Sequence, residues 1–413
     1  MKLFIIVCLL VTAVTGGIWA YRDGPVVDDR DLRKPRSEIS AARNGFTILQ
    51  QAGEALAISE QDLSIVEKSW EPEDKWNFAE INPVLARNEV ALGLFLNASV
   101  RSEFQVPEIA SMGELQPYLG NWQKLRRLAL GAALARHATG DSAQALDMTI
   151  ATLRIGHRLQ DSGGGIVNWL VQGGIKNQAL LAAFRILRDA KFEAAQLEEF
   201  AAEVKGLGDN RIGFERVCYA EYRLILGSVD AVLKGQLIID DEEPHKYSGG
   251  RLKVAPGLYK PNITTTLIAE YCRQLLATLD RDSYEPVRQD YPTFREAILD
   301  GNTLGNLIFR ECAVGVSGVD RRRRRTSAQV SILQVSLAML SYAEQHDQYP
   351  ETLFAMVPKF LHEVPQDPFD GQSLKLSHRT VYSVGPNRVD DGGNVQALLS
   401  SQGDLGFDLP ERP

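Results

Sequence analysis

The sequence NWQKLRRLALGAALARHATGDSAQALDMTIATLRIG, residues 121–156, determines the fold class. On both sides of Gly140 its apolar residues recur at the three- and four-residue spacing of one helix face. Asn121 is the expected cap of the first helix, Gly140 interrupts that helix, and Asp141 precedes the second helix. The stretch therefore predicts two helices joined by a short turn.

Helical spacing extends outward from this hairpin, from about residue 37 to residue 315. Glycines and prolines separate the further helices that the pattern predicts, at residues 166–187, 194–207, 212–233, 264–279 and 293–309. We therefore expect a mainly α protein, with an all-helical domain over residues 23–320.

The hairpin resembles a single tetratricopeptide unit. Ala145 occupies the small position of that repeat and Leu153 the large position of its second helix. Ala129 and Arg136, however, stand where the repeat has large or aromatic residues, and no second copy follows at a period near 34 residues. A generic helical domain is the expectation, and a tetratricopeptide-like array is the alternative.

An uncharged apolar segment occupies residues 3–20, directly after Lys2. Its length reaches the roughly 18 residues that a membrane helix needs, and Trp19 and Tyr21 suit the membrane interface. We predict that residues 1–22 form an N-terminal membrane helix, a single-pass inner-membrane anchor with the body in the periplasm. The alternative is a signal peptide, whose cleavage would leave a periplasmic or secreted protein.

The overall composition is that of a globular protein with an acidic balance. Apolar residues make up 44% of the chain, charged residues make up 24%, and the net charge is −8. That charge argues against a nucleic-acid partner, because nucleic-acid binding needs a broad basic surface. Cys218, Cys272 and Cys312 are widely spaced and lack zinc-site spacing, so we expect three buried free thiols. The alternative is one disulfide pair in an oxidising compartment.

Five consecutive arginines, Arg321 to Arg325, precede a helix expected at residues 327–346. Cations at a helix start oppose the helix dipole, so a neighbouring group must compensate them. We expect a solvated linker or docking onto an acidic surface of the same chain. The alternative is a patch for anionic lipid. The run is also the predicted boundary of a C-terminal module, residues 321–413.

The last part of the chain predicts a small α+β module. Residues 374–376 and 381–384 alternate as a short antiparallel hairpin, and Asp370-Gly371 is a turn signal. A polar, glycine-rich loop follows at residues 385–393, and residues 404–410 close the module.

This order resembles the C-terminal domain of type II secretion major pseudopilins. The shared features are a tyrosine-proline segment, a DPF-x-G turn, a Y-S-x-G strand, an acidic glycine-rich loop and a terminal Asp-Leu, here Tyr349-Pro350, Asp367 to Gly371, Tyr382 to Gly385, Asp390 to Gly393 and Asp404-Leu405. In that family the acidic loop holds calcium, which implies Asn387, Asp390, Asp391 and Asp404 as metal ligands here. The alternative is a network of hydrogen-bonded turns. Asn387 stands where the family has Asp, and Arg388 adds a cation.

The whole chain also resembles uncharacterised bacterial membrane-anchored envelope proteins. That resemblance implies a non-enzymatic role, binding or scaffolding with a protein partner in the cell envelope, accessory to a type II secretion or pilus-like system. One alternative is a hydrolase-type enzyme that uses Glu215, Glu221 and Glu270. Another is a membrane-surface sensor that uses the arginine run.

Overall fold

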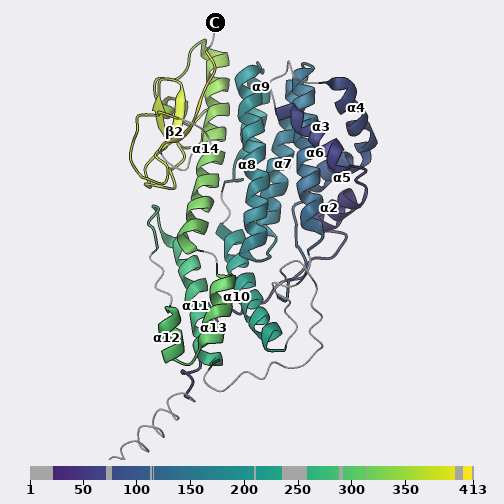
Figure 1. The fold of residues 1–413 in the computed structure, drawn as a ribbon. Coiled ribbons are helices and arrows are strands. Elements are labelled where there is room, and N and C mark those ends of the chain that lie inside the picture. The colour runs from purple at the N-terminus through teal and green to yellow at the C-terminus, as the bar shows by residue number, and fades with distance from the viewer. Residues whose placement is uncertain are drawn as a thin grey trace, which may run out of the picture.

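The computed structural model describes residues 22–70, 77–111, 114, 116–208, 211–234, 258–287, 292–313, 315–395 and 403–411. The described chain is mainly helical, with one small antiparallel sheet near its C-terminal end, which confirms the predicted class (Figure 1). Residues 3–20 lie outside the described residues. Among the helices that are described, none combines the length and the apolar character that a membrane crossing requires.

The predicted hairpin is present as α6 (Tyr118–Ala138) and α7 (Ser142–Asp161). Gly140 adopts a φ of +92°, which L side chains rarely accept, and the Asp141 side chain accepts a hydrogen bond from the Gln144 N–H at 3.2 Å. The prediction that Asn121 caps the first helix is wrong. The helix begins at Tyr118, directly after Pro117, whose fixed φ suits a helix start.

Four long helices stand side by side in the upper part of Figure 1: α6, α7, α8 (Ile166–Asp189) and α14 (Val316–His346). The shorter α9 (Ala194–Val204) packs against α14. The largest hydrophobic core lies among these helices and continues into the C-terminal sheet.

The amino-terminal helices cover the outer face of α6. They are α2 (Gly45–Glu54), α3 (Glu60–Glu67), the short 3₁₀ helix η1 (Lys68–Trp70), α4 (Phe78–Arg87) and α5 (Glu89–Ser99). They enclose a second core, in which the Phe46 ring meets the Trp122 ring edge-on at 5.8 Å between centroids.

A third core lies in the lower part of Figure 1. It is built by α10 (Arg211–Leu233), α11 (Pro261–Ala277), η3 (Thr278–Asp280) and α13 (Thr303–Cys312), with the first turns of α8 and α14. The short α12 (Phe294–Leu299) precedes α13 in the same part of the figure. The single helix predicted at residues 293–309 is two helices. Gly301 has a φ of +67°, and the Asn302 side chain accepts hydrogen bonds from Lys260 N at 2.8 Å and Thr264 Oγ1 at 3.0 Å. The three cysteines are buried in this core as free thiols, as predicted.

The segment at residues 23–33 is fastened to this lower group. The Asp23 carboxylate accepts hydrogen bonds from the N–H groups of Asn262 at 2.9 Å and Ile263 at 3.3 Å, at the start of α11. Arg273 of α11 pairs with Asp31 at 2.8 Å. Acidic side chains at a helix N-terminus are electrostatically favourable, so these contacts fix the position of residues 23–33 on α11.

The C-terminal sheet confirms the predicted hairpin and adds a strand. After α14 and η4 (Leu353–Met356), β1 (Lys375–Ser377) pairs antiparallel with β2 (Thr380–Ser383), and β2 pairs with β3 (Leu405–Asp408). The sequence did not predict β3 as a strand. Its Phe407 ring packs on Phe184 of α8 at 4.6 Å, so the sheet lies against α8 as well as α14.

Candidate functional site

The DPF-x-G turn of the C-terminal module is organised by a buried acid. The Asp367 carboxylate accepts hydrogen bonds from Phe369 N at 2.9 Å, Ser383 Oγ at 2.8 Å and Val384 N at 2.7 Å. Burial raises the pKa of Asp367, although these hydrogen bonds to the carboxylate act in the opposite direction. This residue therefore joins the turn to β2 and has a structural part in the module.

The predicted metal ligands fall into two groups. Asp404 is buried, and its two carboxylate oxygens accept hydrogen bonds from Asp391 N at 3.3 Å and Gly393 N at 2.8 Å. The Asn387 amide donates to Asp391 Oδ2 at 3.4 Å. The structure thus brings Asn387, Asp391 and Asp404 together at one end of the sheet.

Asp390 has other partners in the same loop and sheet. Its carboxylate accepts hydrogen bonds from Tyr382 Oη at 3.1 Å and Gly392 N at 3.0 Å, and it pairs with Lys375 at 3.2 Å. Within the described parts of the chain, no group of three or more His, Cys, Asp and Glu side chains is placed to hold a metal ion. As arranged, the loop fits a calcium ion only in part, and calcium binding stays a prediction.

The arginine run lies inside α14, which begins at Val316 and continues through the predicted boundary at residues 320/321. Arg324 is buried and pairs with buried Asp320 at 3.0 Å. Its guanidinium also donates to the carbonyl oxygens of Pro368 at 2.6 Å and Arg281 at 2.9 Å. Arg321 and Arg322 are exposed. The run therefore contains one buried residue, Arg324, which links α14 to the segment just after η3 and to the C-terminal module.

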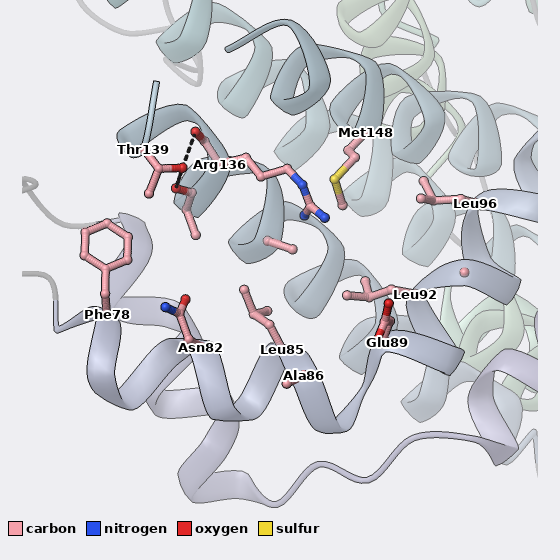
Figure 2. Close-up of a pocket in the computed structure, with 13 residues that line it drawn as sticks. Phe78, Asn82, Leu85, Ala86, Glu89, Leu92, Leu96, Arg136, Thr139 and Met148 are labelled. Atoms are coloured by element: carbon pink, nitrogen blue, oxygen red, sulfur yellow. Dashed lines mark hydrogen bonds between the residues drawn. The ribbon is translucent and has the colours of Figure 1, made fainter. Parts of the chain in front are cut away.

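A groove of about 490 Å³ lies between the amino-terminal helices and the central hairpin (Figure 2). Helices α4 and α5 form one wall, and α6 and α7 form the other. It is lined by Phe78, Asn82, Leu85, Ala86, Glu89, Leu92, Gly93, Leu96, Ala132, Ala135, Arg136, Thr139 and Met148. We call this surface the α4–α6 groove. Its volume is within the range of ligand-binding pockets.

The α4–α6 groove combines an apolar lining with two charged groups. Leu85 and Leu96 remain half-exposed on one wall, and the Arg136 side chain extends beside Met148 on the other (Figure 2). Arg136 Nε donates to the Gln144 side chain at 2.7 Å. In the part of the chain that the structure describes, neither Arg136 nor Glu89 has an ion-pair partner. The groove can therefore take an apolar segment that also carries charge.

The three acids of the predicted hydrolase site occupy different environments. Glu221 of α10 is fully buried, and its carboxylate accepts a hydrogen bond from Ile166 N, the first residue of α8, at 2.8 Å. Burial raises the pKa of Glu221 to about 7. Glu215 is half-buried near Arg211, and Glu270 is exposed. The structure does not bring the three together.

Sequence reasoning missed the α4–α6 groove, Asp320 and the burial of Asp367. The apolar spacing of α4 and α6 was visible, but that spacing does not tell which helices meet. No protein-family model, curated protein or solved structure matches this chain.

Proposed function

We propose that this chain is a non-enzymatic binding protein of the cell envelope that holds a protein partner in the α4–α6 groove. The observation that carries the proposal is the groove itself, a concave and largely apolar surface between two pairs of helices. The apolar segment at residues 3–20 supports membrane anchoring with a periplasmic body. The pseudopilin-like order of the C-terminal module supports an accessory place beside a type II secretion or pilus-like system.

The lining of the groove specifies the chemistry of the partner. Leu85, Leu92 and Leu96 offer apolar surface, and burial of such surface is the main source of affinity in protein contacts. Arg136 adds a cation without a carboxylate partner among the described residues. The fitting partner is an amphipathic segment that presents apolar side chains, one acidic group for Arg136 and one basic group for Glu89.

Site-specific crosslinking in intact cells tests this proposal. A photoreactive p-benzoylphenylalanine at Ala86, which is exposed in the groove, should form a crosslink to a partner protein. The same group at Val90 is the matched control, because Val90 is 69% exposed and does not line the groove.

A blocking substitution distinguishes the groove from incidental contact. A Cβ atom at Gly93 meets no other atom within 4 Å, so a side chain fits there without disturbing the fold. Gly93→Phe should remove the Ala86 crosslink, whereas Gly93→Ala should keep it. A crosslink that survives Gly93→Phe, or that forms equally at Val90, would contradict the proposal.

A further inference from the structure

A second pocket, of about 310 Å³, shares no lining residue with the α4–α6 groove. Four segments meet there: residues 34–39, residues 103–105, the loop at residues 162–164, and the face of α10 around residues 216–223. The first two are joined by hydrogen bonds, from Ile39 N to Gln105 Oε1 at 3.0 Å and from Gln105 Nε2 to the Ser37 carbonyl at 2.6 Å. We call this the basic pocket.

The basic pocket is cationic on a chain whose net charge is −8. Four cationic side chains line it, and the single acid in the lining is Glu103, which pairs with Arg43 at 2.5 Å. The four cations are Lys34, Arg36, Arg216 and Arg223. Such a concentration of one sign of charge in a concave site raises the local concentration of counter-ions.

Two of these guanidinium groups donate to backbone carbonyls, and no ion pair at contact distance holds them among the described residues. Arg36 donates to the carbonyl of Val106, and Arg216 donates to the carbonyl of Asp161 at 3.1 Å. Among the described residues neither has a carboxylate in ion-pair contact, whereas Arg223 pairs with Glu108. Burial lowers the pKa of Arg36, and the nearby carboxylates of Glu108 and Glu38 act in the opposite direction.

The loop at the floor of the pocket leaves room for a ligand. Gly163 and Gly164 have φ values of +81° and +115°, and a Cβ atom at Gly163 would meet no other atom within 4 Å. No hydrogen bond within the described chain uses the backbone N–H groups of these two glycines. Both glycines line the pocket together with the two arginines, and Gly164 packs closely against Asn168 and Val106.

We infer that the basic pocket binds a phosphate-bearing anion, held by the guanidinium groups of Arg36 and Arg216. A guanidinium presents paired N–H donors that match two oxygens of one phosphate group, and charge-assisted hydrogen bonds of this kind are strong. The volume accommodates a phosphate with an attached group. The phosphate belongs either to a soluble compound or to the headgroup of an anionic lipid.

Titration calorimetry of the full chain with inorganic pyrophosphate tests the soluble source, and co-sedimentation with phosphatidylglycerol or phosphatidylcholine vesicles tests the lipid source. We expect binding to pyrophosphate, or a preference for phosphatidylglycerol over phosphatidylcholine. In either case Arg36→Gln and Arg216→Gln should each weaken it on the order of tenfold. Arg36→Lys, which keeps the charge but not the paired donors, should fall between wild type and Arg36→Gln.

Controls keep the inference open to refutation. Arg295→Gln removes one exposed cation on α12 and should leave affinity unchanged. Arg216 is exposed, so Arg216→Gln should leave the fold intact, and a loss of affinity in this variant reports on binding. The inference is wrong if neither probe binds, or if the Arg36 and Arg216 variants bind as wild type does. Pyrophosphate binding that the Arg36 and Arg216 variants weaken, without a vesicle preference, identifies a soluble phosphate. A phosphatidylglycerol preference that these variants weaken, without pyrophosphate binding, identifies a lipid headgroup.

Discussion

At the scale of single residues, the fully buried Glu221 couples protonation to stability. Its pKa rises from 4.5 to about 7 because burial disfavours the carboxylate. Between these values the folded protein holds a proton that the unfolded chain has lost, so stability falls as pH rises from about 4.5 to about 7. The shift corresponds to about 3 kcal/mol across that window.

Glu221→Gln should therefore remove a pH-dependent loss of stability. The difference in unfolding free energy between variant and wild type should change by about 3 kcal/mol between pH 4.5 and pH 8, in favour of the variant at the higher pH. Denaturant melts at several pH values measure this difference. Glu270→Gln, on the exposed face of α11, is the control and should show no such trend. Parallel curves for wild type and Glu221→Gln would refute the prediction.

His157 acts on stability in the opposite direction. Burial, together with the charges of Lys176 and Arg158, lowers its pKa from 6.5 to about 3. The unfolded chain binds a proton in that range that the folded protein does not, so stability falls as pH drops below about 6.5. The two effects offset each other between about pH 4.5 and 6.5, which is why the comparison needs the Glu221 variant and not the wild-type curve alone.

At the scale of elements, the acidic loop after β2 has two explanations that one measurement separates. The hydrogen bonds from Asp391 N and Gly393 N to Asp404 hold the loop without a metal. If these hydrogen bonds alone hold the loop, the melting temperature is the same in millimolar calcium and in chelator. A calcium-dependent rise that Asp391→Ala abolishes would instead establish the site implied by the pseudopilin resemblance, because a ligand stabilises the state that binds it.

Local sequence signals predicted which helices and strands form better than they predicted where each begins and ends. The α6–α7 hairpin and the β1–β2 hairpin follow from periodicity and turn residues, which act over a few positions. The break at Gly301 and the strand β3 depend on distant partners, Lys260 for the first and β2 for the second. The sequence also did not predict that α14 begins at Val316, because the arginine run is expected to precede the helix. Arginines are unfavourable in a first turn, but here they lie beyond it and beside Asp320.

At the scale of the whole molecule, the Asp320–Arg324 pair joins three parts of the chain. Arg324 is bound by the carboxylate of its own helix, by the carbonyl of Arg281 just after η3 and by the DPF-x-G turn. Removal of one partner of a buried ion pair leaves the other charge without compensation, at a cost of about 3–5 kcal/mol. We expect Arg324→Met to lower the unfolding free energy by this amount.

Arg322→Met is the matched control for Arg324→Met. Arg322 is exposed in the same run, and exposed substitutions of this kind change stability by about 0.5 kcal/mol or less. Thermal or denaturant melts of both variants make the comparison. Equal melts would mean that the run is solvated throughout and that the buried Asp320–Arg324 pair contributes little.

The candidate sites also depend on the whole molecule. The C-terminal metal ligands could be proposed from sequence because they lie within one short segment. The α4–α6 groove and the basic pocket could not, because each forms where segments far apart in the chain meet. In the basic pocket, Arg36 and Arg216 lie on opposite sides of the α6–α7 hairpin in sequence.

The seat of residues 23–33 on α11 has a consequence for how the protein would work at a surface. With Asp23 on the first turn of α11 and Asp31 paired with Arg273, the segment at residues 23–33 is held against the body. If residues 3–20 span the inner membrane, only a few residues separate the bilayer from the folded body. The short connection would then keep the folded body at a nearly constant distance and orientation relative to the membrane, which a long flexible linker would not do. A partner would therefore bind at a fixed distance from the membrane, and only a partner that reaches this distance could bind.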